Sequence, residues 1–223
     1  GLTYVAALFG NVWQYAHPVA ALHDWLARFA PSSAPRAWPV GWSMWPAVFG
    51  FFAYRWLENV YPDSAVPEKL AALVALYVIV TLFGMRYFGK ETWLRNGDPF
   101  SVFFRFLARF AVLSHITRAG RTKFVLRPPV VGVFERDETV DASVVAFVLL
   151  MLASVAYDGV EVTPLWQNIR AFGLPDVLAG TLGLIAVWGL FAAVYTVFSG
   201  LIRAVTGTAV RTATLAETFV FSL

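Results

Sequence analysis

Two charged residues, Arg55 and Glu58, lie within an otherwise apolar stretch of the sequence. A spacing of three residues places both side chains on one face of a helix, where they can form an ion pair. An ionisable group at membrane depth costs about 3 kcal/mol on insertion scales, so its presence needs a reason. The commoner reason is a structural ion pair that joins neighbouring helices, and the alternative is a functional site.

Two more carboxylates, Asp158 and Glu161, follow a second apolar stretch. If Glu58 lies on the same side of a membrane, the three acidic side chains could form a cleft for a cation, a proton path or a polar substrate. Glu58, Asp158 and Glu161 are therefore the candidate catalytic residues. The commoner arrangement is a solvated helix end, with Asp158 in a turn before Gly159.

The chain has three histidines. His17 and His23, with Asp24, form a loose polar group near the start of the sequence. A spacing of six residues does not place two imidazoles together on a helix as a metal pair requires. We therefore expect ordinary interfacial residues here, and the sequence indicates no metal site and no cofactor.

The composition is far more apolar than that of a soluble domain, with 59% hydrophobic and 14% charged residues and 20 Phe and 9 Trp. It predicts an integral membrane protein. There is no Cys, which excludes disulfides, thiolate nucleophiles and Cys zinc sites. The excess of basic residues does not indicate nucleic-acid binding, because Lys and Arg gather beside apolar runs, where they face the cytoplasm and anionic lipid.

The apolar runs predict an all-α bundle that crosses the membrane. A span needs about 20 residues, and four stretches fit: 42–61, 70–88, 140–157 and 177–202. Apolar residues at helical spacing predict amphipathic helices in the membrane interface at 18–30, 100–113 and 162–172. Short extended pieces are expected at 124–126 and 130–134.

Small residues in the fourth predicted span indicate close helix packing. Ala179 with Gly183, and Gly189 with Ala193, have the small-xxx-small spacing that lets two helix backbones approach each other. We expect these four positions to face neighbouring helices.

The distribution of basic residues predicts the orientation. Fourteen Lys and Arg lie on one side of four alternating spans and two on the other, and the richer side is cytoplasmic under the positive-inside rule. The loop 89–139 is therefore expected in the cytoplasm, and the turns 62–68 and 158–176 outside. Six basic residues of the loop are candidates for binding lipid headgroups or an acidic partner: Arg105, Arg109, Arg118, Arg121, Lys123 and Arg127.

Several phrases of the sequence resemble a known family. They are RWLENVYP (55–62), FGKETWL (88–94), GDPFSVFF (97–104), LAR (107–109), YDG (157–159) and TPLW (163–166). Over about residues 45 to 166 the chain resembles the uncharacterised multi-pass bacterial membrane proteins that are often labelled "fenitrothion hydrolase". The resemblance implies a bacterial membrane location and organophosphate hydrolysis.

Hydrolysis of that kind usually depends on a metal that several His and carboxylate ligands hold. The sequence contains neither an HExxH motif nor a GxSxG motif. Our leading hypothesis is therefore a non-catalytic subunit or scaffold of the bacterial inner membrane, packed against lipids and other membrane proteins in a bioenergetic or transport complex. A membrane-embedded hydrolase and a small-molecule transporter are the alternatives. We expect one transmembrane domain over 1–223, and a longer parent chain.

Overall fold

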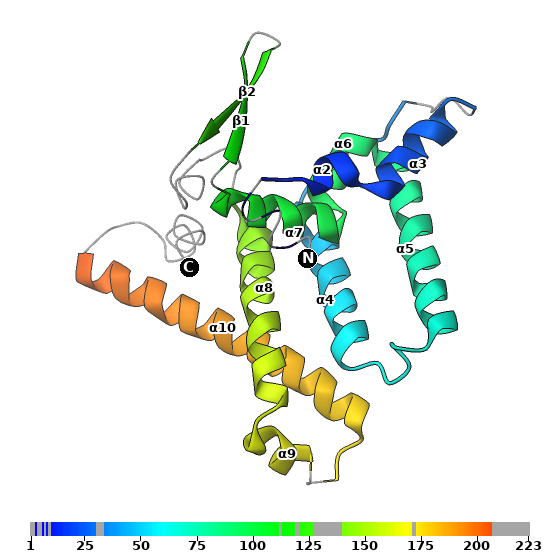
Figure 1. Cartoon of the computed structure of the whole chain (residues 1–223). Helices are drawn as coiled ribbons and strands as arrows, with labels where there is room; N and C mark the ends of the chain where they lie inside the picture. Colours follow the sequence, from blue (N-terminus) through cyan, green and yellow to red (C-terminus); the bar gives the residue numbers. More distant parts are fainter. Residues whose placement is uncertain are drawn as a thin grey trace. The chain divides into compact units, whose positions relative to one another are not determined.

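A computed structural model of the chain describes residues 10–29, 34–111, 113–118, 121–126, 140–170 and 173–206, with Thr3, Ala6 and Leu8. Most of these residues are helical (Figure 1). Three helices are long and apolar enough to cross a membrane: α5 (Pro67–Phe88), α8 (Ala142–Glu161) and α10 (Asp176–Thr206). The prediction of a helical membrane protein is confirmed at this level.

The first predicted span forms a shorter helix than the other three. Helix α4 covers Trp45–Asn59, which is 15 residues. At 1.5 Å per residue it is about 22 Å long, less than a hydrocarbon core of about 30 Å. Residues 40–44 before it form turns, and the chain turns again at 62–65 before α5 begins.

The structure divides into two compact units. One unit comprises 1–47 and 77–139. It contains several short helices and the second half of α5. The short helices are α2 (Trp13–Ala16), α3 (Pro18–Ala27), α6 (Lys90–Asn96), α7 (Pro99–Leu107) and the 3-10 helix η1 (Ala108–Phe110). Its core includes Val19, Ala20 and Met85. Gly84 is required there, because a Cβ on it would lie 2.2 Å from the indole of Trp93.

The second unit comprises 48–76 and 140–221 and is organised around α8 and α10. The hydroxyl of Tyr157 on α8 donates to the carbonyl of Gly180 on α10 at 3.0 Å. Further along the same helices, the indole of Trp188 donates to the carbonyl of Ala146 at 3.2 Å. Helix α9 (Pro164–Arg170) lies between α8 and α10 in the chain and adds Trp166 to their core.

An antiparallel hairpin follows η1, formed by strands β1 (Leu113–Arg118) and β2 (Arg121–Leu126). The sequence predicted extended structure only at 124–126 of this stretch, and 130–134 lies outside the described residues. The helix expected over 100–113 ends at Leu107. The aromatic residues at helical spacing therefore continue past the end of the observed helix.

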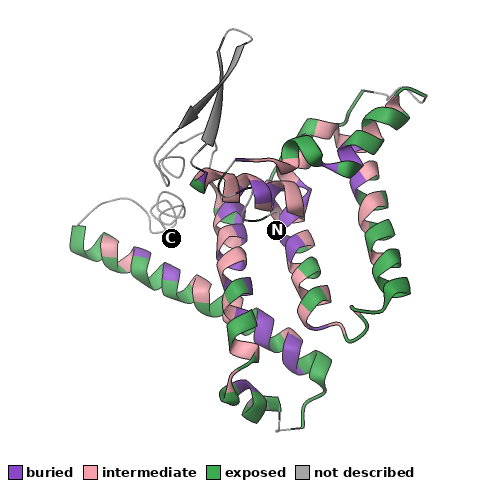
Figure 2. Cartoon of the chain, in the orientation of Figure 1, coloured by how far each residue is buried: buried purple, intermediate pink, exposed green. Residues whose placement is uncertain are grey.

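Burial differs sharply among the three long helices (Figure 2). In the most apolar part of each, 44% of α8 is buried in the protein, against 17% of α5 and 22% of α10. Helix α7 is covered on more than one side, since the buried residues Val102, Phe104 and Phe106 are spaced by two and so point in directions about 200° apart. The predicted surface helix with a single buried stripe is not confirmed here.

Candidate functional site

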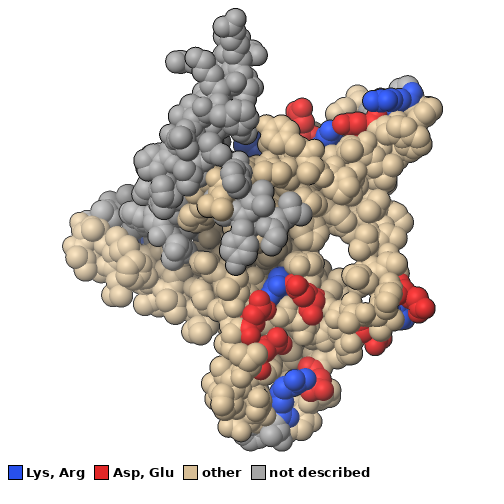
Figure 3. Space-filling model, viewed as in Figure 1, with Lys and Arg blue, Asp and Glu red and all other residues tan. Residues whose placement is uncertain are grey.

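A polar network, here called the Arg55 cluster, joins α4 to α8. It comprises Arg55, Glu58, Asn59, Asp158 and Glu161. The guanidinium of Arg55 donates to Glu58 and to Asp158, and also to the backbone carbonyl of Ser154 at 3.1 Å. Figure 3 shows acidic groups gathered around a basic one on this face of the molecule.

Asn59 extends the network and was not singled out in the sequence. Its side-chain amide donates to Asp158 at 2.7 Å and to Glu161 at 3.3 Å. The position lies one helical turn after Arg55, so both side chains leave α4 on the same face. The sequence does contain a signal for this residue, since Asn59 is a polar amide four residues after Arg55 in an apolar stretch. The three predicted acidic residues thus share one network, and Asn59 links two of them.

The exposure of these charged side chains favours a structural ion pair over a catalytic site. The side chain of Arg55 is only 11% exposed, whereas Glu58 and Asp158 are 46% and 51% exposed. The cation is buried between two carboxylates that remain in contact with the surroundings, so its charge is compensated without strong desolvation of the acids. This arrangement holds two helices together.

Two atoms of the cluster are left without a partner among the described residues. The Nε of Arg55 and the Oδ1 of Asn59 are both buried and make no hydrogen bond there. No group of three His, Cys, Asp or Glu side chains in the described part of the chain is placed to hold a metal ion. The cluster can position a polar group against these two atoms, and its side chains do not form a ligand set for a metal.

An aromatic core lies next to the cluster in the same unit. The ring of Tyr157 packs edge-on against Trp166, with 5.7 Å between the ring centroids. The indole of Trp56 on α4 donates to the hydroxyl of Thr181 on α10 at 2.8 Å. Helix α4 is therefore joined to α8 by the ion pair of Arg55 with Asp158, and to α10 by the hydrogen bond from Trp56 to Thr181.

The structure separates the four predicted helix-packing positions into two pairs. Ala179 and Gly183 are buried, and a Cβ on Gly183 would lie 2.1 Å from the ring of Trp166. Gly189 and Ala193 are exposed, and a Cβ on Gly189 would meet no atom within 4 Å. Gly180, not singled out in the sequence, also packs closely, because a Cβ there would lie 3.0 Å from Val60.

The structure divides the predicted polar group: His23 and Asp24 are neighbours, with 3.4 Å between Nδ1 and Oδ1, whereas His17 has another partner. His17 is buried at 3% exposure and pairs with Asp98, with 3.4 Å between Nε2 and Oδ2. Asp98 is fully buried and also accepts from the hydroxyl of Tyr77 at 2.9 Å. His17 is therefore a buried, hydrogen-bonded residue, and its place relative to a membrane stays a prediction. Asp98 was missed, although an Asp before Pro and two residues ahead of a Phe-Ser pair is typical of a helix N-cap.

Asp24 is exposed on α3, whereas the side chain of His23 beside it is only 17% exposed. Asp24 accepts from the ammonium of Lys90 at 2.6 Å. That hydrogen bond lowers the pKa of Asp24 below its ordinary value of 3.8. The bond connects α3 to α6 within the first unit.

The predicted headgroup-binding residues differ in their surroundings. Arg105 donates to the carbonyl of Arg95 at 2.9 Å and to the sulfur of Met44 at 3.3 Å, so it is directed into the protein. Arg105 and Arg109 both lie over the ring of Phe106, at 5.5 and 5.8 Å from its centroid.

The other predicted headgroup-binding residues lie further along the chain. Arg118 pairs with Arg121, and Ile116 with Lys123, in the backbone register of the hairpin. Arg127 lies outside the described residues.

Comparison with known proteins gives no relative from which a function could be transferred. No family model matches the chain, and no curated protein and no solved structure is significantly similar to it. The class is defined by the structure itself: a helical protein in which three helices are long and apolar enough to cross a membrane.

Proposed function

We propose that this chain is a non-catalytic subunit of a bacterial inner-membrane complex, which packs against other membrane proteins through its apolar helix faces. One observation carries the proposal: α5 and α10 are mostly exposed along their apolar lengths, whereas the charged groups of the Arg55 cluster are bound to one another. An apolar helix face that its own chain leaves uncovered is available to lipid or to another membrane protein.

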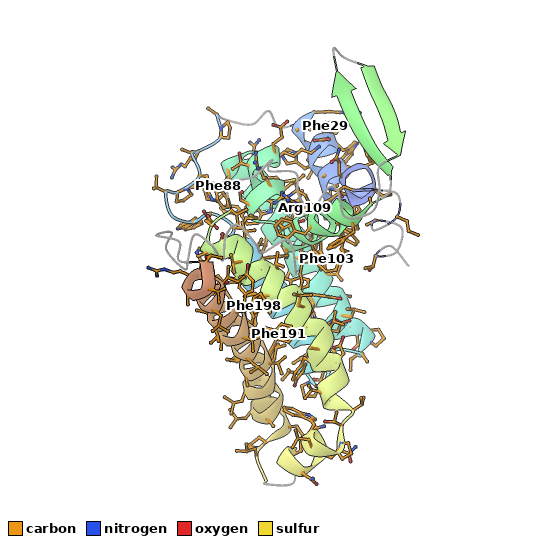
Figure 4. The ribbon with its side chains drawn as sticks, turned by 90° about the vertical axis from the view of Figure 1, so that its left-hand side faces the viewer. Phe29, Phe88, Phe103, Arg109, Phe191 and Phe198 are labelled. Carbon is orange, nitrogen blue, oxygen red and sulfur yellow. The ribbon has the colours of Figure 1, made fainter. Side chains whose placement is uncertain are left out.

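The exposed face of α10 fits a partner helix better than the face of α5. Gly189 and Ala193 are exposed one turn apart, and small residues let another backbone approach. Large exposed apolar residues lie on the same side of the helix, including Leu182 and Ile185. Phe191 and Phe198 both belong to this helix (Figure 4). Small positions beside large ones give a surface into which the side chains of a second helix can fit.

The proposed arrangement in the membrane has four spans, with α4 and its flanking turns forming the first. The loop 89–139 is cytoplasmic, and the turns 62–68 and 158–176 lie outside. Helix α3 and the basic residues near α7 then lie at the cytoplasmic headgroups, where Arg and Lys are favoured by anionic lipid. No nucleic-acid partner is proposed.

The topology can be tested by cysteine labelling, because the chain contains no Cys. We expect Asp63→Cys to react with an impermeant maleimide in intact spheroplasts. Glu91→Cys is expected to react only after the membrane is opened. Gln14→Cys should behave like Glu91→Cys if α4 crosses the membrane. Labelling of Gln14→Cys from outside would show that α4 does not cross the membrane.

The subunit proposal is tested by purification from native membranes in mild detergent, with mass spectrometry of the co-eluting proteins. We expect a constant set of membrane proteins at fixed stoichiometry. Ala193→Leu should remove a partner by filling the small-residue face. Val194→Leu, on the neighbouring exposed position, should retain it. A chain that elutes alone, or only with copies of itself, would refute the proposal.

A further inference from the structure

The hydrogen bonds of His17 determine which of its ring nitrogens carries the proton. His17 is the N-cap of α3, and its Nδ1 accepts the backbone N–H of Ala20 at 3.2 Å. A nitrogen that accepts a hydrogen bond carries no proton. The proton of the imidazole is therefore on Nε2, which donates it to Oδ2 of Asp98 at 3.4 Å. In this arrangement the imidazole is neutral.

The carboxylate of Asp98 is fully engaged from several elements. Its Oδ2 also accepts the N–H of Ser101 at 2.7 Å, which makes Asp98 the N-cap of α7. Its Oδ1 accepts the hydroxyl of Tyr77 on α5 at 2.9 Å. The side chains of His17 and Asp98 are only 2% and 0% exposed. The pair thus joins the N-terminus of α3 to α5 and α7.

The titratable groups around His17 are few. Asp98 faces it from the start of α7, and Tyr77 reaches the same carboxylate from α5. Helix α2 contributes the uncharged ring of Trp13, 5.0 Å away. On α3 itself, the contact is the backbone N–H of Ala20.

We propose that His17 is a proton-operated switch for the N-terminal turn of α3. A second proton on the imidazole binds at Nδ1, which changes this nitrogen from an acceptor into a donor. Two donors, Nδ1–H and the N–H of Ala20, then face each other, and the cap is lost. The bond from Nε2 to Asp98 remains and is strengthened, because an imidazolium and a carboxylate attract each other.

Protonation therefore releases one end of α3 without detaching His17. The other end stays attached through the bond between Asp24 and Lys90. Helix α3 presents Leu22, Trp25 and Leu26 on its exposed side. Release of the first turn removes one attachment of the helix that carries these apolar side chains. The test below brackets the range in which a free imidazole changes charge, about pH 5 to pH 8.

The test is hydrogen exchange of the Ala20 amide, measured by NMR on the full chain in nanodiscs at pH 7.5 and pH 5.0. After correction for intrinsic exchange, we expect protection of this amide to be about fivefold lower at pH 5.0, as loss of a typical N-cap implies. Amides within α8 serve as the internal control and should keep their protection. Equal protection of Ala20 at both pH values would overturn the proposal.

The matched variant is His17→Asn, which keeps an oxygen for capping but does not titrate in this range. Its Ala20 protection should not change between the two pH values, and a change like that of the unaltered chain would refute the role of His17. A second measurement needs no variant. The ¹⁵N shifts of the His17 ring at pH 7.5 should show the proton on Nε2, and a proton on Nδ1 at that pH would also overturn the proposal.

Discussion

Gly183 on α10 gives the sharpest test of how the second unit is packed. In Gly183→Ala, the new Cβ would lie 2.1 Å from one carbon of the Trp166 ring and 2.7 Å from another, whereas ordinary contact begins at 3.4 Å. The indole would have to move by more than about 1 Å. It is buried and packs against Tyr157, whose hydroxyl is bound to the backbone of α10. The movement is therefore opposed.

Overpacking of this kind costs about 1–3 kcal/mol, and the burial of Trp166 favours the upper part of that range. Alanine also gains about 1 kcal/mol over glycine in a helix interior. Gly189→Ala has the same gain on the same helix but meets no atom within 4 Å. The difference in unfolding free energy between the two variants therefore isolates the steric cost, which we expect to be about 2–3 kcal/mol.

The assay is reversible unfolding in mixed micelles by added SDS, followed by far-UV circular dichroism. Gly189→Ala should unfold at or above the SDS fraction of the unaltered chain, and Gly183→Ala clearly below it. Replacing Trp166 by Leu should remove most of the cost of Gly183→Ala, because the shorter side chain leaves room. Equal stability of the two alanine variants would refute the packing described for α8, α9 and α10.

Three further predictions concern single interactions. Arg55→Met should lower the unfolding free energy by about 1–3 kcal/mol, because it removes the charged hydrogen-bond donor that joins α4 to α8. Arg170→Met, at an exposed ion pair, should change it by less than about 0.5 kcal/mol. Both are measured by SDS unfolding. Gly89→Ala should cost about 1–3 kcal/mol in the same assay, since Gly89 has φ +87° and a Cβ would lie 3.2 Å from Pro35. Asp24→Asn should lower the unfolding free energy at neutral pH. The difference in unfolding free energy from the unaltered chain should vanish as the pH falls through the lowered pKa of Asp24, below 3.8. A constant difference down to pH 3 would contradict this.

The sequence by itself determined the class of protein and the positions of the long helices. Uninterrupted apolar runs longer than about 18 residues are rare outside membranes, so 70–88, 140–157 and 177–202 were predicted close to the observed α5, α8 and α10. It also singled out Arg55, Glu58, Asp158 and Glu161, because charge inside or beside such runs is costly and therefore conspicuous. These inferences depend only on local composition.

Which residues meet was decided by the tertiary structure. Arg55 and Asp158 are 103 positions apart in the chain, and His17 and Asp98 are 81 apart, so no local pattern joins them. The same spacing of small residues gave a tightly packed pair at Ala179 and Gly183 and an exposed pair at Gly189 and Ala193. Spacing places side chains on one face of a helix, but only the path of the other helices determines whether that face meets protein.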